Sequence, residues 1–234
     1  MSPQSPVPPE LERYTSAFAQ EVPLSTPPDD IRFVALDCET TGTDARRDRI
    51  ITMGAVTVTR GEILLEDQFE SLVRVSHNTS AVLVHGVTAE EAAREGVDEQ
   101  EAILQFLDFV RDGVIVGHHI GFDIEVIRNA CRRCFQIELK NRWIDTMELT
   151  LHLEETGVFE KLQSSSGSMS PFRDFSLDGL CRVFQIQPHD RHTAAGDAFI
   201  TAQIFLKLLR LAKRAGRDSL ETLIERYVDP RASD

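Results

Sequence analysis

The chain has 234 residues, 41% of them hydrophobic and 27% charged, and its formal net charge at pH 7 is −13. This length allows one ordinary domain with an extension, and the composition is that of a soluble globular protein. No apolar stretch is long enough to span a bilayer, and residues 1–6 lack the basic and apolar regions of a signal peptide, so we expect a cytoplasmic protein with no membrane partner. The acidic balance argues against a protein that holds nucleic acid by bulk electrostatics, but not against an enzyme that grips a few terminal nucleotides.

Cysteine usage gives no sign of a disulfide framework, because four cysteines are too few for one in a chain of this size. Cys131 and Cys134 form a lone C-x-x-C, and the sequence shows no second pair that would complete a zinc site. We therefore interpret both as ordinary, partly buried thiols.

Residues 1–30 are predicted to be a proline-rich N-terminal extension. Proline clusters bracket a helix expected between Glu10 and Gln20, and such clusters neither continue a helix nor lie inside a sheet. A disordered tail is slightly favoured over a tether or docking arm that would bind a polymerase or another protein.

The main domain is predicted to cover residues 31–215, with a C-terminal helix and tail over residues 216–234. Apolar runs predict strands at 31–36, 50–59 and 62–69, with a turn at Arg60-Gly61, which gives a three-stranded antiparallel start. Residues 71–75 are expected to extend the third strand. Two further short strands are expected at 114–117 and 143–145.

Helices are predicted between and after the later strands. The first has a capping-box pattern, with Thr88 as the N-cap and Glu91 three residues later. The others are expected at 98–110, 122–134, 146–153, 176–184, 193–215 and 219–227, and residues 156–174 read as a mobile surface loop or lid. Strands followed by alternating strands and helices predict an α/β fold with a mixed five-stranded sheet flanked by helices.

Three short segments carry the candidate chemistry. Asp37 and Glu39 are two residues apart at a predicted strand end, so both side chains project from one face and could share hard divalent cations. Asp123 follows the strand at 114–117 where a helix begins, a position that also suits plain helix capping. His192 and Asp197 stand at the opening of the longest helix, where an exposed imidazole suits a general base.

Taken in order, these segments resemble the DEDDh group of 3′–5′ exonucleases in the DnaQ-like superfamily, which includes the epsilon proofreading subunit of bacterial DNA polymerase III. The family's first motif, D-x-E-T-T-G, is matched at 37–42. The second motif ends in Phe-Asp, matched at Phe122-Asp123, and the third, H-x-A-x-x-D-A, is matched at 192–198. The resemblance covers roughly residues 31–211 and implies an RNase H-like fold.

The resemblance also implies a mechanism and a substrate. Two Mg²⁺ or Mn²⁺ ions would be held by Asp37, Glu39, Asp123 and Asp197, and His192 would take a proton from the attacking water. The expected reaction releases nucleoside 5′-monophosphates from single-stranded or frayed 3′ ends. The favoured function is proofreading or repair of DNA, and the alternative is a 3′–5′ exoribonuclease of the same superfamily. A third interpretation, less favoured than these two, is a non-catalytic module that binds a polymerase.

Six residues are candidates for gripping the terminal nucleotides. The family often has His-Asn before the second-motif aspartate, whereas this chain has His118-His119, which puts the details of the strand contact in doubt but not the catalysis. For Met53 and Phe122, packing in the core is the alternative to a contact with the substrate. The candidates are Thr40, Thr41, Met53, His85, His119 and Phe122.

Overall fold

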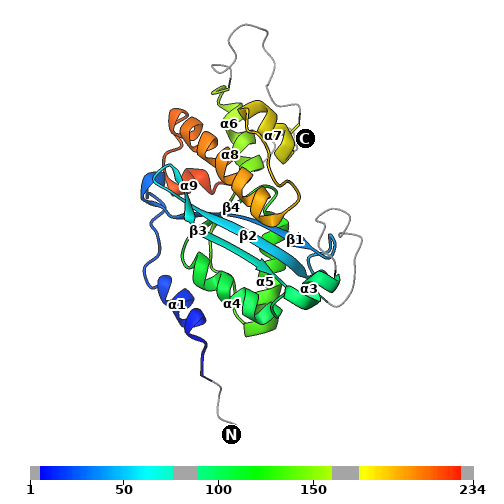
Figure 1. Cartoon of the computed structure of the whole chain (residues 1–234). Helices are drawn as coiled ribbons and strands as arrows, with labels where there is room; N and C mark the ends of the chain where they lie inside the picture. The colour runs from blue at the N-terminus through cyan, green and yellow to red at the C-terminus, as the bar shows by residue number, and fades with distance from the viewer. Residues whose placement is uncertain (1–5, 76–88, 160–173, 228–234) are drawn as a thin grey trace, which may run out of the picture.

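A computed structural model of the chain describes residues 6–75, 89–159 and 174–227 (Figure 1). The predicted capping residue Thr88, the candidate His85 and most of the predicted loop at 156–174 lie outside these residues. None of the helices in the described ranges combines the length and the apolarity that a membrane crossing needs.

A five-stranded mixed sheet forms the centre of the molecule, as the sequence predicts. Its strand order is β3-β2-β1-β4-β5, in which β1 pairs antiparallel with β2 and β2 antiparallel with β3, while β1–β4 and β4–β5 are parallel. β3 is an edge strand of this sheet. The strands are β1 (Phe33–Thr40), β2 (Ile50–Thr59), β3 (Glu62–Leu72), β4 (Val114–Gly117) and β5 (Trp143–Asp145).

Strand β1 is longer than predicted, because it continues past Leu36 through both candidate carboxylates to Thr40. Acidic residues are uncommon in strands, but here the ladder with β2 continues through Glu39, which pairs with Thr52, to Thr40, which pairs with Ile50 after a register shift. β3 also runs on to Leu72, and Val73 makes one more bridge, to Val97. The predicted extension of this strand is therefore confirmed only as far as Val73.

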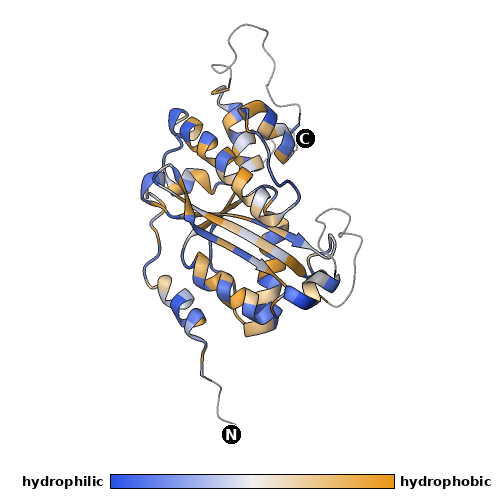
Figure 2. Cartoon of the chain, viewed as in Figure 1, coloured by the Kyte–Doolittle hydropathy of each residue, from blue (hydrophilic) through white to orange (hydrophobic). Residues whose placement is uncertain are grey.

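Helices cover both faces of the sheet, and their apolar sides turn toward it (Figures 1 and 2). One apolar core lies between the sheet and the helices of one layer, and a second core lies on the opposite face. One layer comprises α1 (Pro9–Ala17), α3 (Ala89–Glu95), α4 (Glu99–Val110) and α5 (Gly121–Phe135). The other comprises α6 (Thr146–Glu155), α7 (Leu177–Phe184), α8 (Ala194–Arg214) and α9 (Leu220–Leu223).

Side-chain caps fix where three of these helices begin. Asp145 accepts a hydrogen bond from the amide of Met147 at the start of α6, and Ser176 accepts one from Gly179 at the start of α7. Thr193 accepts one from Gly196 at the start of α8. These caps satisfy amides that have no partner inside the helix, so they place the start of α8 within the third motif.

Most of the N-terminal extension is folded, so the expected disordered tail is wrong for residues 6–30. Leu11 and Tyr14 of α1 are buried in the core beneath the sheet, and the Tyr14 hydroxyl donates to Asn141 Oδ1 at 2.9 Å. A short 3₁₀ turn (Pro28–Asp30) then leads into β1. Two apolar side chains one helical turn apart are a weak sequence signal, which explains the error.

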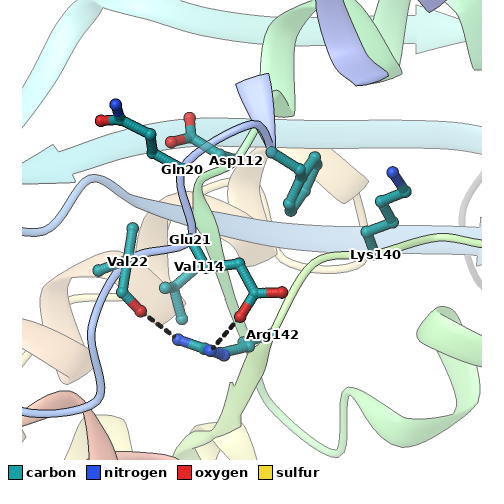
Figure 3. A pocket seen from close by; sticks show the side chains of 8 residues that line it. Gln20, Glu21, Val22, Asp112, Val114, Lys140 and Arg142 are labelled. Atoms are coloured by element: carbon teal, nitrogen blue, oxygen red, sulfur yellow. Dashed lines mark hydrogen bonds and ion pairs between the residues drawn. The ribbon is translucent and has the colours of Figure 1, made fainter. Parts of the chain in front are cut away.

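Further along, the extension contacts both the sheet and the C-terminal region. Figure 3 shows Arg142, which donates to the carbonyl of Val22 at 2.6 Å and forms an ion pair with Glu21 at 3.3 Å. The amide of Leu220 in α9 donates to the carbonyl of Thr26 at 2.9 Å. Residues 20–26 therefore tie the start of the chain to its end.

Helix α9 is much shorter than the predicted helix at 219–227 and stops at Leu223. Arg217 donates to the carbonyl of Thr222 and to the carboxylate of Glu225. The last carbonyls of a helix have no partner inside it, so Arg217 satisfies one of them at the C-terminal end of α9.

Candidate active site

Asp37 and Glu39 lie on one face of β1, because alternate residues of a strand point the same way. Both are half-buried. Asp37 faces Gly54 across the antiparallel ladder with β2. The strand thus carries both carboxylates on its last half, as a fixed pair.

Gly54 allows the start of α8 to reach this pair. A Cβ on Gly54 would lie 2.2 Å from the amide nitrogen of Ala195, closer than side-chain atoms approach backbone. The absence of a side chain therefore lets α8 rest directly on β2, next to Asp37. Asp197, in the first turn of α8, is carried to the same place and is 7% exposed.

Three of the four predicted metal ligands converge. One carboxylate oxygen from each of Asp37, Glu39 and Asp197 lies within 4.8 Å of the others. These residues come from β1 and α8, which are far apart in the sequence. Such a set of oxygen atoms is the ligand type that hard divalent cations prefer.

Asp123, the fourth predicted ligand, lies in the first turn of α5 and is 7% exposed. Burial and the charges of Glu39 and Asp145 raise its pKa to about 8. Hydrogen bonds from backbone amides, including the amide of Cys38, oppose this rise. These influences place it beside β1, although it is not one of the three residues within 4.8 Å of each other. Helix capping does not account for it, because the N-cap position of α5 is Ile120.

Burial, followed by the repulsion between neighbouring carboxylates, raises the pKa values of the cluster. Burial and the charges of Asp123, Asp197 and Glu39 hold the pKa of Asp37 well above its usual range. Burial and Asp197 raise the pKa of Glu39 to about 7. Groups placed so that their negative charges oppose one another are suited to binding a cation, which removes the repulsion.

One buried oxygen tests whether a metal ion fits this cluster. Oδ2 of Asp197 accepts a hydrogen bond from Arg191, whereas Oδ1 is buried and has no hydrogen-bond partner among the described residues. A buried carboxylate oxygen without a partner is costly, and a bound cation would satisfy it. The residues present therefore fit a divalent cation held by Asp197, Asp37 and Glu39, with Asp123 beside them.

His192 stands in the turn just before the Thr193 cap, and it is exposed, as expected for a residue at the junction of loop and helix. Its backbone is left-handed, with a φ of 63°. The pKa of Asp178 on α7 is lowered mainly by its hydrogen bond with Arg191, and burial opposes this effect. The charges of Arg191 and His192 lower it further. The imidazole is therefore accessible from solvent.

Thr40 and Thr41 shape the loop that follows the two strand carboxylates. The Thr40 hydroxyl donates to the carbonyl of Gly42 at 2.7 Å, and the Thr41 hydroxyl donates to Asp48 Oδ1 at 2.7 Å. The amide of Arg49 donates back to the Thr41 hydroxyl at 3.0 Å. These bonds give both side chains a structural role within the loop, next to Glu39.

The remaining predicted substrate contacts differ in exposure. His119 is exposed, with a φ of 55°, and its amide donates to Asp145 Oδ1 at 3.1 Å. Phe122 is half-buried and packs against the core under the sheet. Met53 is fully buried and packs in the core, which is the alternative that the sequence leaves open for it. His85 lies outside the described residues.

Arg191 is a functional candidate that sequence reasoning missed. It donates to Asp178 on α7 at 2.7 Å and to Asp197 on α8. The available signal was a single basic residue directly before His192 in a strongly acidic chain. That signal is weak, because the partner Asp178 lies 13 residues away and only the fold brings it close.

Other features lie outside the cluster. A cavity of about 370 Å³ between the extension and the start of β4 is lined by residues such as Phe18, Val114 and Lys140, and none of its lining residues is a predicted site residue (Figure 3). Cys131 is buried and Cys134 half-buried on α5, and both are free thiols.

With this geometry established, comparison with known proteins identifies the family. Residues 34–205 match the sequence model of a family described as "Exonuclease". This match covers most of the chain and includes all five predicted catalytic residues, so the chain belongs to that exonuclease family. The resemblance inferred from the motifs is confirmed.

Similar proteins with curated descriptions include PolC-type DNA polymerase III from two bacteria. The protein of Thermotoga maritima is 30% identical over 196 residues, which is 83% of this chain and 13% of that protein. The protein of Bacillus subtilis is 30% identical over 187 residues, which is 79% of this chain and 12% of that protein. The chain thus spans a small part of the length of these relatives.

Similar solved structures include E. coli Exonuclease I bound to a dA16 oligonucleotide. Its TM-score is 0.67 at 20% identity, over 80% of this chain and 42% of that chain. A complex of Exonuclease I described as ExoI/SSB-Ct gives a TM-score of 0.66 at 20% identity, over 79% and 42%. These structures show that the fold is the RNase H-like fold of such exonucleases.

Proposed function

We propose that this protein is a two-metal-ion 3′–5′ exonuclease that releases nucleoside 5′-monophosphates from DNA ends. The observation that carries the proposal is the convergence of Asp37, Glu39 and Asp197 beside the buried Asp123, with one oxygen of Asp197 unpartnered among the described residues. Membership of the exonuclease family supports nuclease chemistry at this cluster.

The four carboxylates would hold two Mg²⁺ or Mn²⁺ ions. When bound, such ions make water more acidic and stabilise the negative charge that develops as a phosphodiester is cleaved. Asp37 would hold metal together with Glu39 and Asp197, whose carboxylate oxygens lie within 4.8 Å of one of its own. Exposed His192, in the turn just before α8, would accept the proton of the attacking water.

DNA is the proposed substrate class. The similar curated proteins are DNA polymerases, and a similar structure holds a DNA oligonucleotide. An exoribonuclease would use the same carboxylates and base, and recognition of the 2′-hydroxyl would separate the two activities. Thr40, Thr41, His119 and Phe122 are the proposed contacts to the terminal nucleotides, since they follow or precede the candidate ligands in the sequence and remain at least partly accessible.

A protein partner such as a polymerase is a second part of the proposal, and it concerns the extension. The inner side of α1 is used against the core, so a partner would contact its outer side, which includes exposed Glu12. Binding of a partner without any hydrolysis would support the non-catalytic reading. The intact set of carboxylates argues against that reading.

The direct test is degradation of 5′-labelled single-stranded DNA and the matching RNA, with Mg²⁺, Mn²⁺ or EDTA. The expected result is a metal-dependent ladder that shortens from the 3′ end, faster on DNA. His192→Ala should lower turnover by about 10²–10⁴-fold through loss of general-base catalysis. Glu66→Gln, at an exposed position of the edge strand, is the matched control and should leave the rate unchanged.

Each alternative result has a defined meaning. Faster shortening of RNA would assign the exoribonuclease activity. No shortening of either strand would contradict the exonuclease proposal for the isolated chain. Near-normal turnover in His192→Ala would remove His192 from the role of base.

A further inference from the structure

Arg191 connects the metal-ligand cluster to a carboxylate outside it. Its Nε donates to Asp178 Oδ1 at 2.7 Å, and its Nη1 donates to Asp197 Oδ2. The side chain of Arg191 is 20% exposed and that of Asp197 is 10% exposed, whereas that of Asp178 is 50% exposed. The guanidinium therefore lies between a buried carboxylate and one at the surface.

The two oxygens of Asp197 have different surroundings. Oδ2 is held by the guanidinium, while Oδ1 is buried with no hydrogen-bond partner in the described part of the chain. Oxygens of Asp197, Asp37 and Glu39 lie within 4.8 Å of one another. Because Oδ2 is occupied, the orientation of the carboxylate is fixed and Oδ1 is the oxygen left for a cation.

We propose that Arg191, anchored by Asp178, is a positioning residue that holds Asp197 in the orientation needed to bind a divalent metal ion. This inference rests on the proposed metal site of the exonuclease. Partners that hydrogen-bond a metal-ligating side chain set its orientation, and their loss typically weakens metal binding by about 10–100-fold.

Arginine suits this position for a geometric reason. Its planar guanidinium presents nitrogens in fixed directions, so one side chain can bind two carboxylates at a set angle. Asp178 belongs to α7 and Asp197 to α8, and Arg191 lies in the turn before α8. The clamp, defined as Asp178 and Arg191, thus ties the metal ligand to a second helix. A lysine could supply the charge but not the two-sided geometry.

A purely structural ion pair is the competing explanation, because Arg191 also joins α7 to α8. A structural role would lower the melting temperature of the variants without changing the affinity of the folded protein for metal. A positioning role would weaken metal binding in protein that is still folded. The two explanations therefore differ in a measurement that does not depend on hydrolysis.

The test is titration of the full chain with Mn²⁺ by calorimetry, with folding checked by circular dichroism. Arg191→Gln should bind Mn²⁺ about 10–100-fold more weakly than the wild type. Arg191→Lys, which keeps the charge, should also bind more weakly, and half-exposed Asp178→Asn should weaken binding in the same direction by a smaller factor. Arg182→Gln is the control, since Arg182 pairs with Asp174 at the surface near the start of the same helix.

The outcomes separate this inference from the proposed function. Mn²⁺ binding by the wild type with unchanged affinity in folded Arg191→Gln and Asp178→Asn would overturn the clamp and leave the metal site intact. Tighter binding in Arg191→Gln would show that the guanidinium competes with the metal, and would also overturn it. Absence of Mn²⁺ binding by the wild type would overturn both the metal site and the clamp.

Discussion

Gly54 and Ala195 meet backbone to backbone, so closely that a Cβ on Gly54 would lie 2.2 Å from the Ala195 amide nitrogen. Gly54 is also the ladder partner of Asp37. One glycine therefore sets how near the third motif comes to the first. The site depends on this contact as much as on its carboxylates.

Gly54→Ala should destabilise the protein and misplace the start of α8. Forcing an extra methyl group into a packed interior costs about 1–3 kcal/mol, and the obstacle here is backbone, which cannot rotate away. Urea unfolding and Mg²⁺-dependent hydrolysis would measure both effects. Gly121→Ala is the matched control, because its Cβ would meet only the Trp143 ring at 3.8 Å, and it should unfold like the wild type. Equal stability of Gly54→Ala and wild type would show that the contact is not limiting.

Tyr14→Phe should destabilise the fold by about 1–3 kcal/mol. The Tyr14 hydroxyl is buried, donates to Asn141 Oδ1 at 2.9 Å and accepts from the amide of Lys140 at 2.7 Å. Its removal therefore takes a partner from the buried Asn141 oxygen and from the part-buried Lys140 amide. Denaturant unfolding measures the change, and Ser16→Ala on the exposed side of α1 is the control. A change below about 0.5 kcal/mol, the usual range for surface substitutions, would mean that α1 adds little to the stability of the domain.

Asp37→Asn should abolish metal-dependent hydrolysis and yet stabilise the metal-free protein. The pKa of Asp37 is raised by burial and by three neighbouring carboxylates. A carboxyl group with a raised pKa costs stability as the pH rises above its unfolded value of about 4, so the gain should be larger at pH 8 than at pH 5, on the order of 1 kcal/mol or more. Urea unfolding in EDTA at both pH values measures it, with Glu66→Gln as the control. Lower stability of the metal-free variant at pH 8 would contradict the repulsion described for the cluster.

His118→Gln should make the protein less sensitive to acid. Burial, followed by the charge of His119, lowers the pKa of His118 to about 4, while its Nδ1 lies 2.9 Å from the Thr146 hydroxyl. A histidine with a lowered pKa contributes stability above its unfolded pKa of about 6.5, and that contribution is lost as the pH falls toward 4. Melting temperatures from pH 7 to pH 4.5 would fall less steeply in the variant than in the wild type. Exposed His189→Gln is the control, and the same slope in wild type and His118→Gln would refute the prediction.

The sequence predicts most elements of the fold because their signals are local. The strand at 114–117 is an uninterrupted apolar run and is observed with the same bounds. The apolar stripe of α4 predicts which of its residues are buried, and Ala102, Phe106 and Val110 are among them. Thr193 begins α8 as predicted, because its side chain caps the helix through a local hydrogen bond.

What the sequence could not predict depends on contacts between distant segments. The ladder with β2 keeps β1 extended through Asp37 and Glu39, against the local preference of acidic residues. The pairing of Arg191 with Asp178 exists only because α7 packs near the start of α8. The complete burial of Met53 likewise follows from its position on β2 in the assembled sheet.

The acidic residues on the edge strand β3 should influence whether molecules of this protein associate with one another. Glu66, Gln68 and Glu70 alternate along β3 at exposed positions, on a strand whose outer edge pairs with no other described strand. Unpaired strand edges template aggregation, and charged side chains along them oppose it. The negative charge on this edge should therefore keep molecules apart in neutral solution, and acidic buffers that neutralise these glutamates should promote self-association before the fold is lost.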